Sequence, residues 1–308
     1  MKIPELITEF LEFLEIEKNV SPLTIRNYRH YLKRFSNWLA DCSPTVPDNK
    51  DINQDTIRRY RLFLTRLSNA KGLTLKRITQ NYHLIALRTF LRFLARKDIQ
   101  TLSPEKIELG KAESHSLKFL SRDQLTRLVN QPDMSTAQGM RDKAMIELLF
   151  STGLRVSELV KLNRDQIDFK TRELGIIGKG SKPRLVFISD TALEWLQKYL
   201  SYRVDPYKPL FVRYSGKKVG KGKGEEGIRL SARSVQRAVE KYVKKAKLPI
   251  KITPHGIRHT FATDLLSAGA DLRAIQEMLG HKNVSTTQVY THVTNPQLKE
   301  IHRKFHGK

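Results

Sequence analysis

Residues 253–291 read TPHGIRHTFATDLLSAGADLRAIQEMLGHKNVSTTQVYT and are the most informative part of this chain. They bring His255, Arg258, His281 and Tyr290 within 36 residues, three basic side chains followed by a phenol. A phosphate under attack is stabilised by positive charge and hydrogen-bond donors, and a tyrosine hydroxyl can serve as the nucleophile. The set therefore suits attack on a phosphodiester without a metal ion. The alternative is a helical domain that is merely rich in His and Arg.

The first two basic residues are expected at the start of a helix. Thr253-Pro254 is typical of an N-cap followed by a first-turn proline, so His255 falls in the first turn. Arg258 lies three residues later on the same face. Free backbone N–H groups and the helix dipole favour an anion at such a position.

The other two residues are expected on separate pieces of chain. A helix that begins at Asp271 should stop at Gly280, a common C-terminal residue, and His281 then lies in a turn. Ser285 can cap a short helix that carries Tyr290, and this small element would be able to move. Packing is the alternative role for the tyrosine, since apolar residues share that helix: Val284, Val289 and Val293.

The bulk properties indicate a polyanionic partner. The 308 residues suffice for two domains, and the net charge is +25 with a pI of about 10.1. A membrane-surface or a ribosomal protein is the alternative. No apolar run is long enough for a membrane span, and the N-terminus does not resemble a signal peptide. Cys42 is the only cysteine, which excludes an intrachain disulfide and a cysteine-rich zinc site, and we expect a cytoplasmic protein.

Residues 1–105 are predicted to form a domain of four or five amphipathic helices. Ser21-Pro22 starts one of them, and two more are expected at about 54–67 and 74–95. The charges on these helices are either solvated and salt-bridged or turned toward DNA. The candidate DNA-binding residues are Arg26, Arg29, Lys76 and Arg77.

Residues 106–118 lose periodicity and are predicted to be a linker before a second domain, 119–308. Ser121 and Gln124 form a capping-box pattern at its start. The expected fold is mainly α with a small three-stranded antiparallel sheet. Its helices are predicted at 121–130, 138–151, 156–162, 190–203, 231–247 and from 254 onward, and its strands at 166–169, 173–177 and 184–188. The Gly/Lys-rich loop 214–229 either contacts phosphate or keeps the protein soluble.

Four segments of the chain resemble the tyrosine recombinase (integrase) family. They are STGLRVSELVKL around Arg155, GKGSKPRL around Lys179, PHGIRHTFAT, and LGHKNVSTTQVYTHV. The similarity covers essentially the whole chain and is closest to the Xer-type chromosome-resolution recombinases. Six motif positions occur in the family's order, and the loop 214–229 is the one departure.

The resemblance implies a role for each of the six residues. Tyr290 is the nucleophile that forms a 3′-phosphotyrosine, and Arg155 and Arg258 bind the non-bridging phosphate oxygens, which suit forked donors. Lys179 protonates the leaving 5′-oxygen, with Lys182 as its alternative. The remaining two are His255, which assists proton transfer at the tyrosine, and His281, which donates a hydrogen bond to phosphate.

The resemblance also implies double-stranded DNA as the partner, at a specific site, and a homotetramer or heterotetramer on it. A DNA translocase as activator is left open. Neither metal, ATP nor any other cofactor is expected, because the phosphotyrosine bond stores the energy of the cleaved bond. Residues 296–308 either reach a neighbouring subunit or fold back on their own domain. Alternative functions are a mobile-element integrase, a type IB topoisomerase-like enzyme and a non-catalytic DNA-binding relative.

Overall fold

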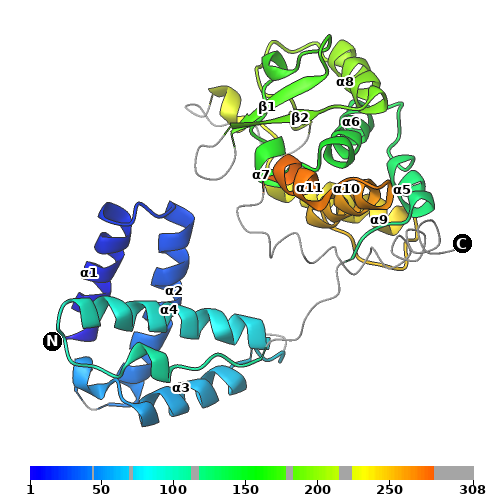
Figure 1. Ribbon diagram of the computed structural model, residues 1–308. Coiled ribbons are helices and arrows are strands. Elements are labelled where there is room, and N and C mark those ends of the chain that lie inside the picture. Colours follow the sequence, from blue (N-terminus) through cyan, green and yellow to red (C-terminus); the bar gives the residue numbers. More distant parts are fainter. Residues whose placement is uncertain (44, 69–71, 112–117, 178–182, 215–223, 281–308) are drawn as a thin grey trace, which may run out of the picture. The chain divides into compact units, whose positions relative to one another are not determined.

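The computed structural model describes residues 1–43, 45–68, 72–111, 118–177, 183–214 and 224–280. The chain divides into two compact units, Met1–His115 and Ser116–Lys308, each with its own hydrophobic core (Figure 1). Over these described ranges, no helix is both long and apolar enough to cross a membrane.

The described part of the first unit contains four α-helices, and the last of them, α4, contacts each of the other three. Figure 1 shows α4 crossing α1 and α2. At the centre of this packing the ring of Phe10 meets those of Tyr28 and Phe90 edge to face, at 5.8 and 5.6 Å between centroids. The helices are α1 (Ile3–Ile16), α2 (Pro22–Asp41), α3 (Gln54–Arg66) and α4 (Arg77–Arg96), with 3-10 turns at Asn49–Asp51 and Pro104–Lys106.

The three helix starts predicted in this unit can be compared with the structure, and the one at Gln54 is confirmed. The α2 start is confirmed, because the Ser21 hydroxyl accepts a hydrogen bond from the Thr24 N–H. The start of α4 was predicted three residues too early. Thr74 pairs with Ser68 in an isolated β-bridge, and the Leu75 N–H donates to the Leu67 carbonyl, so these backbone groups are not free to begin a helix.

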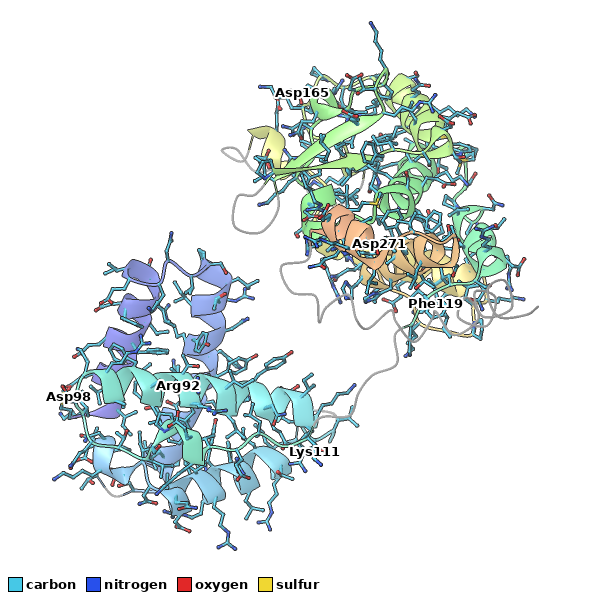
Figure 2. All side chains as sticks on the ribbon, viewed as in Figure 1. Arg92, Asp98, Lys111, Phe119, Asp165 and Asp271 are labelled. Atoms are coloured by element: carbon cyan, nitrogen blue, oxygen red, sulfur yellow. The ribbon has the colours of Figure 1, made fainter. Side chains whose placement is uncertain are left out.

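The predicted linker begins with residues that belong to the first unit. Ile107 is fully buried in its core. The Asn81 side chain holds both backbone groups of Gly110, donating to its carbonyl at 2.7 Å and accepting from its N–H at 3.2 Å. Arg61 donates to the Glu108 carbonyl. The chain therefore leaves the first unit after this anchored segment, near Lys111, which Figure 2 labels.

The second unit is mainly helical, with a small antiparallel sheet whose register pairs Glu173 with Phe187 and Ile177 with Pro183. Its helix α6 runs through the core and contacts α8, α10 and α5. The described elements are α5 (Arg122–Val129), α6 (Ala137–Thr152), α7 (Val156–Leu159), β1 (Glu173–Ile177), β2 (Pro183–Phe187), α8 (Asp190–Tyr202), α9 (Ala232–Lys245), α10 (Pro254–Ser267) and α11 (Leu272–Leu279), with 3-10 turns at Arg164–Gln166 and Gly224–Gly227.

The predicted fold class holds, but the prediction of a third strand at 166–169 is wrong. Gln166 ends a 3-10 turn, and its side chain accepts a hydrogen bond from the Asn163 N–H. The Gln166 N–H donates to the Asn163 carbonyl at 3.3 Å, and the Asp168 carbonyl accepts from the Arg172 N–H at 3.0 Å. Backbone groups that are already satisfied within local turns do not join a ladder. Among the described residues the sheet has two strands.

Gly153 lies where the core helix α6 meets α10. It follows α6 in the left-handed conformation, with φ of 59°. A β-carbon on this residue would lie 2.4 Å from Cδ1 of Phe261 on α10. The contact between α6 and α10 thus depends on glycine at this position.

We expect Gly153→Ala to lower the free energy of unfolding of the second unit by about 2–4 kcal/mol, from backbone strain plus overlap with Phe261. Each unit contains one of the two tryptophans, so the fluorescence of Trp195 in a Trp38→Phe background reports on the second unit alone. Urea titration provides the measurement.

Gly269→Ala is the matched control. This glycine also has a positive φ, 93°, but its added β-carbon meets no atom within 4 Å, so only strain of about 1 kcal/mol is expected. Equal losses in the two variants would contradict the proposed overlap with Phe261.

Candidate active site

Arg258 lies in the first turns of α10, where the cap predicted at Thr253 is present: its hydroxyl accepts from the Gly256 N–H. The arginine is only 1% exposed. Its Nη1 donates to the Gly153 carbonyl at 2.7 Å, and its Nη2 donates to the Leu279 carbonyl at 2.6 Å. These carbonyls end α6 and α11, and helix C-termini carry partial negative charge. The guanidinium is therefore held between two helix ends.

Arg155 is the N-cap residue of α7, and its side chain is 34% exposed. Its Nη1 donates to Oε1 of Glu158 at 3.0 Å, and its Nη2 donates to the Gly280 carbonyl at 3.1 Å. The backbone N–H of Arg155 also donates to Oε2 of Glu158 at 2.8 Å. These hydrogen bonds hold the guanidinium of Arg155 in one orientation, while part of the side chain remains accessible to a phosphate.

Glu158 connects Arg155 to a third arginine, Arg184 on β2. Nη1 and Nη2 of Arg184 donate to Oε1 and Oε2 of the carboxylate, at 3.0 and 2.8 Å. Burial raises the pKa of Glu158, but the hydrogen bonds from Arg184 and Arg155 outweigh it and hold the pKa at about 2. The carboxylate is ionised throughout the neutral range.

Three arginines from three elements converge on the end of α11. Arg184 donates through Nε to the Met278 carbonyl at 3.2 Å, while Arg258 and Arg155 bind the next two carbonyls, those of Leu279 and Gly280. Figure 1 shows α7, α10 and α11 gathered together below the sheet. Asp271, labelled in Figure 2, caps the opposite end of α11. The predicted glycine stop is confirmed, since Gly280 has φ of 64°.

His255 occupies the first turn of α10, with its ring centroid 4.2 Å from that of His259. Partial burial of the ring, which disfavours its charged form, is the main cause that lowers the pKa of His255 from the ordinary 6.5. The positive charges of Arg258 and Arg155 lower this pKa further. The imidazole is therefore neutral near pH 7 and able to accept a proton. The residue remains exposed at the surface.

The structure thus brings together three of the six predicted catalytic residues: Arg155, His255 and Arg258. The other three, Lys179, His281 and Tyr290, lie outside the described residues. Glu158 and Arg184 were not selected from the sequence. A signal for each was present, because both lie in segments that carry the family resemblance, Glu158 in STGLRVSELVKL and Arg184 in GKGSKPRL.

The residues predicted to bind DNA lie in the first unit. Arg26 and Arg29 are on α2, Arg77 is the first residue of α4 and Lys76 is its N-cap, and all four are exposed. In the described ranges of the chain, His, Cys, Asp and Glu do not gather in groups of three that could hold a metal ion.

Two family models together match most of the chain. Residues 118–296 match the phage integrase family, and residues 7–98 match the phage integrase N-terminal SAM-like domain. The chain belongs to the phage integrase family. It is a site-specific tyrosine recombinase, an enzyme of DNA strand exchange, as the resemblance implied.

Individual relatives agree over nearly the whole length. Tyrosine recombinase XerC of Pelotomaculum thermopropionicum is 39% identical, with 98% of each chain covered. Tyrosine recombinase XerD of Oceanobacillus iheyensis is 36% identical, again with 98% of each covered. Among solved structures, XerH recombinase in a post-cleavage complex with a palindromic difH substrate has a TM-score of 0.70 at 21% identity, with 96% of this chain and 84% of that chain covered, which supports the fold.

We expect Glu158→Gln to remove a pH-dependent part of the stability of the second unit. Because the folded-state pKa of about 2 lies below the ordinary 4.5, the carboxylate stabilises the fold fully above pH 4.5, and this contribution is lost as the pH falls toward 2. It corresponds to a free energy of unfolding on the order of 2–3 kcal/mol.

The measurement is urea unfolding at about pH 7 and about pH 3, followed by Trp195 fluorescence in the Trp38→Phe background. Glu194→Gln on the exposed side of α8 is the control and should keep the wild-type pH dependence. If both variants lose stability with pH as the wild type does, Glu158 does not carry this contribution.

Proposed function

We propose that this recombinase cuts duplex DNA at a specific site through Tyr290, forms a 3′-phosphotyrosine with release of a 5′-hydroxyl, and rejoins strands by the reverse step. The observation that carries the proposal is the convergence of Arg155 and Arg258 on the end of α11, ten residues before Tyr290 in the sequence. Two guanidiniums at the end of α11, where the chain leads on to Tyr290, suit a phosphodiester whose non-bridging oxygens gain charge.

Each proton in the cleavage step has a proposed carrier. The Tyr290 oxygen forms a bond to phosphorus as the bond from phosphorus to the 5′-oxygen breaks. His255, neutral near pH 7, takes the tyrosine proton, and Lys179 gives a proton to the leaving oxygen. His281 donates a hydrogen bond to the phosphate. In the reverse step a 5′-hydroxyl from another strand attacks the phosphotyrosine.

The burial of Arg258 suggests an order of events. Arg155, with a partly exposed side chain, is the first guanidinium that a phosphate meets. Arg258 is 1% exposed, and its two terminal nitrogens bind backbone carbonyls. We propose that the protein around Arg258 rearranges when DNA binds, so that the second guanidinium also reaches the phosphate.

The first unit, Met1–His115, is proposed to be the core DNA-binding domain, and the second unit, Ser116–Lys308, the catalytic domain. Exposed apolar residues recur along one stripe of α4, at Ile78, Tyr82 and Ile85, next to the candidate basic residues. Such a mixed basic and apolar surface suits DNA. Solved relatives include recombinases and integrases in complex with DNA, one of them a dimer on its core site.

The names of the curated relatives, XerC and XerD, favour a role in resolving chromosome dimers or circular replicons in the cytoplasm. We propose a homotetramer or heterotetramer on two paired sites, with residues 296–308 available to contact a neighbouring subunit. Activation by a DNA translocase is part of the same proposal.

A nicked duplex that loses its 5′-hydroxyl fragment on cleavage should trap the wild-type chain as a covalent adduct. Tyr290→Phe should form no adduct and should bind the same DNA with unchanged affinity. The phenol oxygen is the only atom lost, so binding is preserved. Denaturing gels measure the adduct on a panel of duplexes that includes the host's chromosomal recombination site.

Tyr202→Phe, which alters an exposed tyrosine at the end of α8, is the matched control and should retain the adduct. A covalent adduct that persists in Tyr290→Phe would show that another residue is the nucleophile. No wild-type adduct on any duplex of the panel would count against the whole assignment.

Removal of metal and nucleotide should leave the cleavage rate unchanged. The proposed site supplies its charge from guanidiniums and stores the bond energy in the phosphotyrosine, so neither Mg²⁺ nor ATP takes part. Single-turnover cleavage in excess EDTA, compared with excess Mg²⁺ at matched ionic strength, is the measurement. A rate that falls in EDTA and returns only with a divalent cation would contradict metal independence.

A further inference from the structure

We propose that Arg184 is a positioning residue of this active site. Its guanidinium joins the Glu158–Arg155 pair, strand β2 and the C-terminal end of α11, so that the phosphate-binding arginine and the chain that leads to Tyr290 keep a fixed spacing. The inference rests on the proposed function, because it concerns the same reaction.

The hydrogen bonds of Arg184 indicate that it acts through other residues. Each of its three guanidinium nitrogens donates to the protein, one to the Met278 carbonyl and two to the carboxylate oxygens of Glu158. The side chain is 11% exposed. Because all three guanidinium nitrogens are hydrogen-bonded within the protein and little of the side chain is exposed, Arg184 is a poor ligand for DNA phosphate.

The first consequence is electrostatic. Arg155, Glu158 and Arg184 together carry a net charge of +1, because one carboxylate is shared between two guanidiniums. Without Arg184 the ionised Glu158 would be balanced by Arg155 alone, and the pair would be neutral. The carboxylate would then compete with a phosphate for the same guanidinium. Arg184 therefore keeps the charge of Arg155 available to the substrate.

The second consequence is geometric. Arg184 is the second residue of β2 and lies five positions after Lys179 in the sequence. Its Nε bond to Met278 ties this strand to α11. A β-carbon on Gly280 would lie 3.1 Å from Cδ of Arg184, so the two segments also touch closely there. One side chain thus sets the distance between β2 and the C-terminal end of α11.

Lysine is not equivalent at this position. A single ammonium group restores the positive charge but cannot reproduce the planar fork that binds two carboxylate oxygens and a carbonyl together. Arg184→Lys should therefore preserve the electrostatic effect and lose much of the geometric one, whereas Arg184→Gln loses both.

The experiment measures single-turnover cleavage of the nicked duplex by the full chain at saturating DNA, together with DNA affinity. We expect Arg184→Gln to slow cleavage by roughly 100-fold and Arg184→Lys by roughly 10-fold, because small misplacements of reacting groups cost this much. The dissociation constant for DNA should change by less than about threefold, because Arg184 does not contact DNA.

The matched structural control is Arg203→Gln. Arg203 is also a buried arginine of the second unit, and it pairs with Asp205 and donates to the Pro209 and Leu210 carbonyls. Its loss should lower thermal stability without slowing cleavage at a temperature well below unfolding. Trp195 fluorescence in the Trp38→Phe background gives the melting temperature of each variant.

The decisive variant combines Arg184→Gln with Glu158→Gln. Once the carboxylate is neutral it no longer competes for Arg155, so the double variant should cleave faster than Arg184→Gln alone. A merely structural role predicts the opposite, since two lost partners destabilise more than one.

The proposal is overturned if Arg184→Gln cleaves at the wild-type rate, if its loss matches that of Arg203→Gln at equal stability, or if the double variant is no faster. These outcomes assume that the wild-type chain forms an adduct. A wild-type chain that forms none would instead overturn the proposed function and this role with it.

Discussion

The interaction on which the proposed active site depends is the binding of arginine side chains to the C-terminal end of α11. Three consecutive carbonyls, those of Met278, Leu279 and Gly280, each accept a hydrogen bond from a different arginine. The last carbonyls of a helix have no partner within the helix and carry partial negative charge. They provide neutral acceptors that hold guanidiniums in place without cancelling their charge, as a carboxylate would.

The carboxylate of Glu158 complements these carbonyls. It is the one acidic group in direct contact with the cluster among the described residues, and it is shared between Arg155 and Arg184. Removal of either partner from a buried, ionised carboxylate is costly, so the triad acts as a unit. The sharing of one carboxylate by two guanidiniums leaves the triad both cationic and rigid, as the proposed phosphate site requires.

The sequence predicted the local structure well wherever a short-range signal exists. The caps at Ser21, Ser121 and Thr253 and the glycine stop at Gly280 all hold, because a cap is a contact between residues three or four positions apart. Errors arose where turns or bridges bind backbone groups that a regular strand or helix would need. The false strand at 166–169 and the early start of α4 both involve backbone groups bound by turns or bridges that periodicity does not reveal.

The sequence by itself determined the basic charge of the chain and the set of candidate catalytic residues: two arginines, two histidines, a lysine and a tyrosine in the order of one family. It also placed His255 and Arg258 on one helix start, which is a local property. The tertiary structure alone decided that Arg155 and Arg258, about a hundred residues apart, bind adjacent carbonyls. It alone showed that Glu158 and Arg184 belong with them. Contacts between distant segments arise from the packing of α7, α10, α11 and β2, and no spacing within the sequence encodes that packing directly.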